Sequence, residues 1–184
     1  MSLIDFFLNG REAQQTLQEV RHRLYRVAYA WCHNAALADD LVQETLTKAM
    51  RKSSQLRDPK ARDAWLFTIL TNCYRDHFRR LRDTDDIDEM EISIETTPET
   101  EMDRSEVVGK VRAAIARLPE GQRQTVTLVD LEGFSYIEVA QILGVPIGTV
   151  MSRLCRARGA LKDLLLPEFQ QNPDSINRVL RRVK

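Results

Sequence analysis

Residues 133–161, GFSYIEVAQILGVPIGTVMSRLCRARGAL, predict two short helices joined by a tight turn. Ser135 and Glu138 have the spacing of a capping box, in which each side chain satisfies a free N–H group at a helix start. Gly144 can take the left-handed conformation that ends a helix, and Pro146 stops that helix from continuing. Two helices that cross steeply at a short turn form a helix-turn-helix.

The second of these helices has one apolar line and one polar face. Its predicted buried residues recur at three and four positions: Val150, Leu154, Ala157 and Leu161. Residues 143–161 contain no acidic residue, and a face of cations and short polar groups suits the major groove of DNA. An ordinary helical hairpin with a solvated basic face is the alternative. The capping box, turn and buried line together favour DNA binding.

Length and composition exclude several classes of protein. A chain of 184 residues allows one domain or two small ones, and no apolar run approaches the roughly 20 residues of a membrane helix. We expect no membrane insertion and no signal peptide, because the N-terminus lacks a basic region and a cleavage-like end. The three cysteines stand singly, so we expect no disulfide and no metal site, which fits a reducing cytoplasm.

The charge is divided unevenly along the chain. Residues 1–82 and 104–184 each carry a net charge of +5, whereas residues 83–103 carry −10 and no basic residue. An acidic segment of this composition is typical of an extended linker. We therefore expect two small helical domains joined by a flexible acidic linker: domain 1–82, linker 83–104, domain 105–166 and tail 167–184.

Helical periodicity extends over most of the chain, and no strand-like alternation of useful length occurs. We expect an all-α fold with further helices over residues 12–33, 36–52, 62–82, 105–118 and 121–132. The histidines are scattered, with no nucleophile or metal spacing beside them and no phosphate-binding loop. We expect no catalytic residue, no cofactor and no enzymatic activity.

Two stretches of the first domain have functional interpretations. The helix over 36–52 opens with acids and ends with bases, which either serves a basic partner or complements the helix dipole. The basic loop over 53–63 and the next helix mix cations with aromatic residues, a combination that binds single-stranded nucleic acid by stacking and phosphate attraction. Most of those aromatic residues are expected in the core.

These features together resemble the extracytoplasmic-function (group IV) sigma factors of bacterial RNA polymerase. The resemblance covers about residues 12–166 and has three stretches in the family's order. They are ADDLVQETLTKAM (38–50), AWLFTILTNCYRDHFRR (64–80) and LPEGQRQTVTLVDLEGFSYIEVAQILGVPIGTVMSRLCRAR (118–158). The resemblance implies a protein that binds core RNA polymerase, reads the −35 and −10 promoter elements, and traps the melted −10 strand.

The resemblance also implies partners and site residues. The partners are promoter DNA, the β′ clamp helices and β flap of polymerase, and an anti-sigma factor. The polymerase-binding residues are Asp39, Asp40, Gln43, Glu44 and Lys48. The −10 residues are Gln55, Leu56, Arg57, Lys60, Arg62, Asn72, Arg75, Arg79 and Arg80. The −35 residues are Thr149, Met151, Ser152, Arg153, Cys155, Arg156 and Arg158.

One departure and three rivals remain. The family very often has Lys or Arg where this chain has Met151, whose side chain can pack on a thymine methyl but cannot donate to guanine. A dimeric helix-turn-helix regulator would leave the first 82 residues unexplained. A decoy that binds only an anti-sigma factor has no need of an intact basic −35 face. An enzyme is disfavoured by the scattered histidines.

Overall fold

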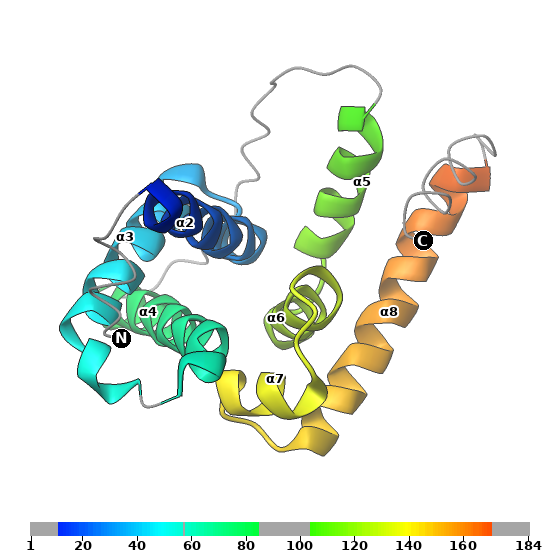
Figure 1. Cartoon of the computed structure of the whole chain (residues 1–184). Coiled ribbons are helices and arrows are strands. Elements are labelled where there is room, and N and C mark those ends of the chain that lie inside the picture. Colours follow the sequence, from blue (N-terminus) through cyan, green and yellow to red (C-terminus); the bar gives the residue numbers. More distant parts are fainter. Residues whose placement is uncertain (1–10, 57, 85–103, 171–184) are drawn as a thin grey trace.

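The computed structural model describes residues 11–56, 58–84 and 104–170 (Figure 1). Every regular element in these ranges is a helix, which confirms the predicted all-α fold. Arg57, the acidic residues 85–103 and the tail from residue 171 lie outside the described residues.

The N-terminal body, residues 11–84, is a bundle of three long helices. Its elements are α2 (Arg11–Cys32), α3 (Ala35–Arg51), the 3₁₀ turns η1 (Ser53–Gln55) and η2 (Pro59–Ala61), and α4 (Arg62–Thr84). Asn34 separates α2 from α3 and caps α3, because its side chain accepts a 2.9 Å hydrogen bond from the Leu37 backbone N–H. The apolar side chains of these helices meet in the bundle core, where the fully buried side chains include Leu24, Trp31, Leu41, Leu66 and Leu70.

The C-terminal body, residues 104–170, contains four α-helices and one π-helical segment. Its elements are α5 (Arg104–Ala116), α6 (Glu120–Val126), the π segment η3 (Thr127–Leu131), α7 (Tyr136–Leu143) and α8 (Ile147–Gln170). The sequence predicted one helix over 121–132, whereas the structure widens its last part into a π turn. Helix α8 also runs past Pro167, where the sequence suggested the start of a polar tail.

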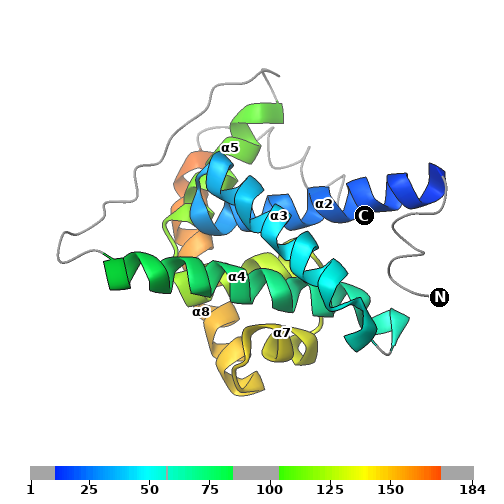
Figure 2. The ribbon, with the colours of Figure 1, turned by 90° about the vertical axis from the view of Figure 1, so that its left-hand side faces the viewer.

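The two bodies are packed against each other. Helix α7 lies on α4, and α2 contacts α5, α6 and η3 (Figures 1 and 2). One apolar cluster continues from α2–α4 into the C-terminal body and includes its residues Leu128, Phe134, Val139, Ile142, Leu143 and Val150. The Phe67 and Phe134 rings meet edge to face across this border at a centroid distance of 5.1 Å. Separate domains were expected, but their mutual packing was not predicted.

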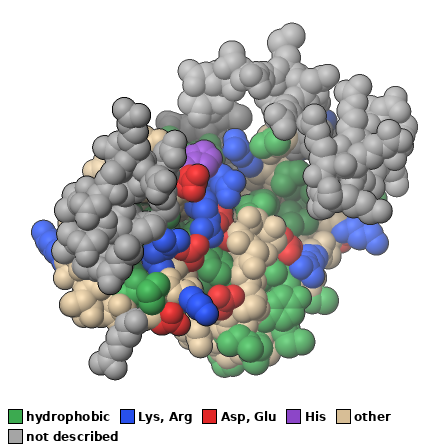
Figure 3. All heavy atoms as spheres, viewed as in Figure 1, with side chains coloured by type: hydrophobic (Ala, Val, Ile, Leu, Met, Phe, Trp, Pro, Cys, Tyr) green, Lys and Arg blue, Asp and Glu red, His purple; other side chains and the backbone are tan. Residues whose placement is uncertain are grey.

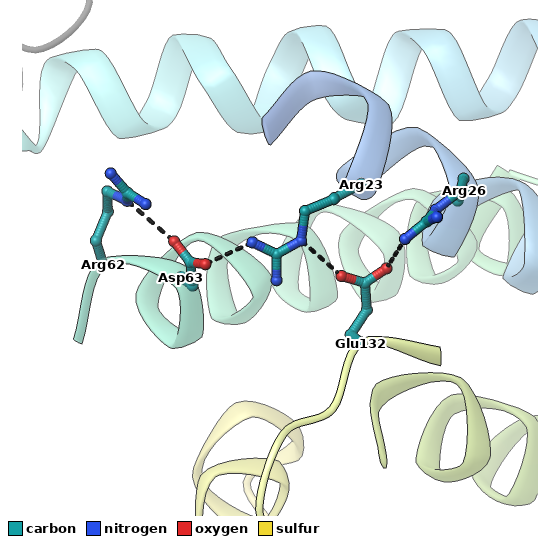
Figure 4. A network of polar contacts seen from close by, with 5 residues as sticks. All are labelled: Arg23, Arg26, Arg62, Asp63 and Glu132. Atoms are coloured by element: carbon teal, nitrogen blue, oxygen red, sulfur yellow. Dashed lines mark hydrogen bonds and ion pairs between the residues drawn. The ribbon is translucent and has the colours of Figure 1, made fainter. Parts of the chain in front are cut away.

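An ionic network also crosses the border between the bodies (Figure 4). Arg23 of α2 lies between Asp63 of α4, at 2.5 Å, and Glu132 of the C-terminal body, at 2.8 Å. Arg26 reaches the second carboxylate oxygen of Glu132 at 2.9 Å. Burial lowers the pKa of Arg23, but its hydrogen bonds and attraction to the two carboxylates outweigh burial and raise that pKa. Arg23 is therefore held in its charged form at the border.

Candidate nucleic-acid interface

The helix-turn-helix of α7 and α8 has the geometry that the sequence predicts. The Ser135 hydroxyl accepts from the Glu138 N–H at 3.3 Å, and the Glu138 carboxylate accepts from the Ser135 N–H at 2.8 Å, so the capping box is complete. Gly144 ends α7 in the left-handed conformation, with φ 61°. The two helices then meet at 104°, within the range of a DNA-binding helix-turn-helix.

Helix α8 packs its predicted line inward and leaves the other face to solvent. Val150, Leu154 and Ala157 are buried, while Leu161 is half-buried and packs against the cluster that contains Leu154 and Ala157. The predicted −35 residues on the solvent face are Met151, Cys155, Arg156 and Arg158; Thr149, Ser152 and Arg153 are half-buried. The start of α8 therefore presents a side that can face a DNA groove.

Two of the predicted −35 arginines already have neighbours within the C-terminal body. The Arg158 guanidinium donates to both carboxylate oxygens of Asp130, at 3.1 and 2.6 Å, and these hydrogen bonds raise the pKa of Arg158. Arg153 lies against Gly121, where an added Cβ would stand 2.9 Å from the guanidinium carbon. Arg156, which lies on α8 with Arg153 and Arg158, is exposed.

An exposed apolar patch adjoins this basic face; the sequence interpretation placed Met151 there but missed Ile137 and Ile147. Ile137, Ile147 and Met151 have exposed fractions of 62%, 46% and 54%. Ile147 and Met151 are one helical turn apart at the start of α8. Ile137 and Ile147 also line a shallow groove with Ala140, Gln141, Gly144, Val145 and Pro146. Figure 3 shows apolar side chains gathered over this end of the molecule. The sequence feature that could have revealed this patch is Ile147, an apolar residue that directly follows Pro146 and precedes the buried line of α8, which starts at Val150.

The predicted −10 residues follow η1, η2 and one side of α4. Gln55, Lys60, Asn72, Arg79 and Arg80 are exposed, and Leu56 is half-buried. Arg62 donates to Asp63 at 3.0 Å, and Arg79 donates to Asp76 at 3.0 Å. Arg75 donates to the Leu143 carbonyl oxygen of α7 at 2.5 Å. All described members of this set lie on the N-terminal body, and Arg75 also contacts the C-terminal body.

The predicted polymerase-binding residues share one side of α3. Asp40 and Gln43 are exposed, whereas Asp39 pairs with Arg21 at 3.2 Å. Glu44 pairs with Lys48 at 2.8 Å one turn later, and this hydrogen bond raises the pKa of Lys48. Such exposed pairs contribute at most about 1 kcal/mol each, so a partner can replace them at little cost.

Residues 11–56, 58–84 and 104–170 hold no group of three or more His, Cys, Asp or Glu side chains that could bind a metal ion. In the same ranges no single helix is long and apolar enough to cross a membrane; α7 and α8 reach that length and composition only as a pair bent by 104°.

Two helical bodies, one with a helix-turn-helix and one with exposed cations along η2 and α4, define a bipartite transcription factor. Family comparison agrees, because residues 16–84 match the model of sigma-70 region 2 and residues 109–161 match that of sigma-70 region 4. A dimeric helix-turn-helix regulator accounts for only the second of these matches.

Individual relatives and solved structures give the subfamily. The chain is 40% identical over 134 residues to the ECF RNA polymerase sigma factor EcfG of Rhodopseudomonas palustris, a match covering 72% of this chain and 73% of that protein. It is 33% identical over 163 residues to the RNA polymerase sigma-H factor of Pseudomonas aeruginosa, covering 82% and 84%.

Two solved complexes share this fold. One is the sigma factor RpoE in complex with the anti-sigma factor NepR from Bartonella quintana, with TM-score 0.67 and 32% identity over 85% of this chain and 98% of that one. The other is CnrH in complex with the cytosolic domain of CnrY, with TM-score 0.60 and 25% identity over 89% and 93%.

The chain belongs to the extracytoplasmic-function sigma factors. It binds core RNA polymerase and promoter DNA and directs promoter-specific initiation of transcription. This family consists of specificity subunits and not of enzymes.

Proposed function

We propose that the two bodies divide promoter reading between them: residues 1–82 read and melt the −10 element, and residues 105–166 read the −35 element. The acidic linker is the segment between α4 and α5, and the tail is the segment after α8. The observation that carries this proposal is the α8 face, which exposes Arg156 beside short polar and apolar side chains and no acidic residue from 143 to 161. A duplex groove of phosphates and base edges is the surface that such a face complements.

The start of α8 reads base edges partly through apolar contact. Ile147 and Met151 stand side by side at the N-terminal end of the recognition helix, which is the part that approaches bases in this motif. Their chemistry selects the 5-methyl group of thymine, with Ser152 and Arg156 supplying polar contacts. Arg153 and Arg158 contact phosphates.

Replacing each −35 thymine by deoxyuridine removes one methyl group and keeps base pairing. We expect the affinity of the wild-type holoenzyme for the promoter to fall several-fold when the thymine at one or two positions is replaced. The same replacement should cause no further loss of affinity in the Met151→Ala holoenzyme. Equal losses in wild type and Met151→Ala would contradict methyl reading.

The −10 surface combines the exposed side of α4 with η1 and η2. A base flipped out of the stack costs a few kcal/mol and needs a protein pocket to hold it. Gln55 and Leu56 provide that contact, and Lys60, Asn72, Arg79 and Arg80 guide the single strand. Asn72→Ala is expected to slow open-complex formation without changing −35 affinity.

The acidic side of α3 docks on the clamp helices of the β′ subunit, and the C-terminal body contacts the β flap. Asp40 and Gln43 are exposed and carry the docking, while the Glu44–Lys48 pair borders it. Asp40→Ala is expected to weaken core-polymerase binding about tenfold, or ~1.4 kcal/mol. Glu19→Ala is the matched control, because Glu19 is an exposed acid on α2 outside this surface.

Regulation by an anti-sigma factor is part of the proposal. The similarity to the sigma factor RpoE, which was solved in complex with the anti-sigma factor NepR, supports it. The protein is further proposed to act in the cytoplasm and to have no catalytic activity of its own.

Run-off transcription tests the whole proposal. Core polymerase and this chain are combined over a library of −35 and −10 elements. Arg156→Ala is compared with Lys162→Ala, which removes an exposed cation from the same helix outside the −35 set. We expect specific transcripts from wild type and Lys162→Ala and a shifted or lost −35 preference for Arg156→Ala. Absence of any specific transcript from wild type would refute the function.

A further inference from the structure

Gly121 lies in the first turn of α6, against the side chain of Arg153 from α8. A Cβ atom added at Gly121 would stand 2.9 Å from the Arg153 guanidinium carbon and 3.0 Å from its Nε atom. Carbon atoms in van der Waals contact stand about 3.5–4.0 Å apart, so a side chain at residue 121 and the guanidinium cannot share this space. The close approach therefore depends on glycine at this position.

The two backbones on either side of this contact are fixed. The Gly121 carbonyl oxygen accepts a hydrogen bond from the hydroxyl of Thr125 at 2.7 Å, and Thr125 is buried. Helices α6 and α8 also share an apolar cluster that contains Val126 of α6 and Leu154 of α8. Because Leu154 directly follows Arg153, the backbone of the arginine is held as well. The part that can move is the end of the arginine side chain.

Packing, and not an ion pair, holds the Arg153 guanidinium. No hydrogen bond or ion pair joins this side chain to another residue in the ranges 11–56, 58–84 and 104–170. Glu120, at the start of α6, accepts instead from the Gln124 amide at 3.0 Å. By contrast, Arg158 further along α8 is held by the carboxylate of Asp130. Arg153 is half-buried, so its stem is packed while its N–H donors stay available to an anion.

A guanidinium that is already placed in the free protein binds a phosphate more tightly than a mobile one. Ordering a long, flexible side chain at an interface lowers affinity by a factor of about 2–10. Contact with Gly121 removes part of this loss, because the side chain is ordered before DNA arrives. The benefit falls on affinity and not on base preference, since phosphate contacts carry no sequence information of their own.

We infer that Gly121 is a positioning residue for promoter binding: its bare backbone seats the guanidinium of Arg153, which contacts a DNA phosphate at the −35 element. The inference rests on the proposed function, in which Arg153 is a phosphate contact. Gly121 acts through Arg153 and needs no contact with DNA itself.

One test uses the free protein. Gly121→Ala adds one methyl group against the guanidinium, and the control Gly109→Ala adds the same group on α5, where nothing lies within 4 Å. Nitrogen-15 relaxation of the Arg153 Nε–H group reports how firmly the side chain is held. We expect an ordered Nε–H group in wild type and Gly109→Ala, and a less ordered one in Gly121→Ala.

Stability to denaturant is measured on the same two variants. Both are expected to be at least as stable as wild type, because alanine favours a helix more than glycine does. In Gly121→Ala the group that must shift is only the end of a flexible side chain. A loss of promoter affinity without a loss of stability therefore separates positioning from a merely structural role.

A second test is a double-mutant cycle in the holoenzyme. The probe is a duplex with the −35 and −10 elements that wild type selects in run-off transcription, and filter binding gives its affinity over a series of salt concentrations. Arg153→Ala is expected to reduce the salt slope by about one. Gly121→Ala is expected to lower affinity about two- to tenfold, and to cause no further loss when combined with Arg153→Ala. Gly109→Ala should match wild type.

Unchanged order of the Arg153 Nε–H group, or unchanged promoter affinity, in Gly121→Ala overturns the inference. So does a loss of affinity that persists in the Arg153→Ala background, or a less stable Gly121→Ala, which would mean that the α6 backbone moves instead. An unchanged salt slope in Arg153→Ala overturns it through its premise, the phosphate contact. Failure of the proposed function is seen separately, as the absence of transcripts from wild type.

Discussion

Acidification should destabilise this protein through His33. The imidazole is buried at the end of α2, with the Arg123 guanidinium 2.9 Å from its Nε2 atom. Burial, followed by repulsion from Arg123, lowers the pKa of His33 from its ordinary value of 6.5 to about 4. The neutral ring accepts the hydrogen bond from Arg123, which assigns its proton to Nδ1.

The sign and size follow from proton linkage. Between pH 6.5 and 4 the unfolded chain binds a proton at His33 that the folded chain does not bind, so stability falls as the pH falls through this window. From pH 7 to pH 5 the expected loss is about 2 kcal/mol. For a chain of this size that corresponds to a melting temperature about 4–8 °C lower.

The assay is chemical or thermal unfolding at pH 7 and pH 5, repeated for His33→Asn. His33 has φ 52°, a left-handed conformation that Asn adopts more readily than most residues. The quantity compared is the change with pH, so the lost hydrogen bond cancels between the two conditions. His22→Asn, which replaces an exposed histidine of α2, is the control. A full acid-dependent loss in His33→Asn would refute the reasoning.

Three further predictions concern α7, its turn and α8. Ser135→Ala removes the helix cap and should lower unfolding free energy by about 1 kcal/mol, whereas an unchanged denaturation midpoint would show that the cap is dispensable. Gly144→Ala forces a side chain into φ 61° and should cost about 1 kcal/mol by the same measurement, with Gly159→Ala as a helical control that should not destabilise. Arg158→Ala should reduce the salt dependence of holoenzyme binding to promoter DNA by about one unit of slope in a filter-binding series, because Arg158 is proposed to contact phosphate; an unaltered slope would contradict that contact.

Local features of this fold follow from nearby residues in the chain. The capping box, the glycine stop and the buried line of α8 each involve residues within a few positions of one another, and each is present as predicted. Helix spacing and amphipathic periodicity likewise located α2 through α5 to within a residue or two. The ordered resemblance of separated stretches then indicated the sigma factor family, which the comparisons confirm.

Other features were outside the reach of sequence patterns. The π turn at η3 is a small change of backbone pitch that periodicity does not resolve. The exposure of Ile147 was missed because an apolar residue at a helix start is usually buried by the packing that follows. The roles of individual site residues remain predictions, since geometry alone tells which are exposed and which are paired.

By itself the sequence determined an all-helical protein with a basic recognition helix and two charged halves, because helix periodicity, caps and turns are encoded between neighbours. Only the tertiary structure decided that these halves close on each other. The Arg23–Glu132 contact joins residues 109 positions apart, and Trp31–Thr127 joins residues 96 apart. No repeat or spacing records such pairs, because they depend on where two separately folded surfaces meet.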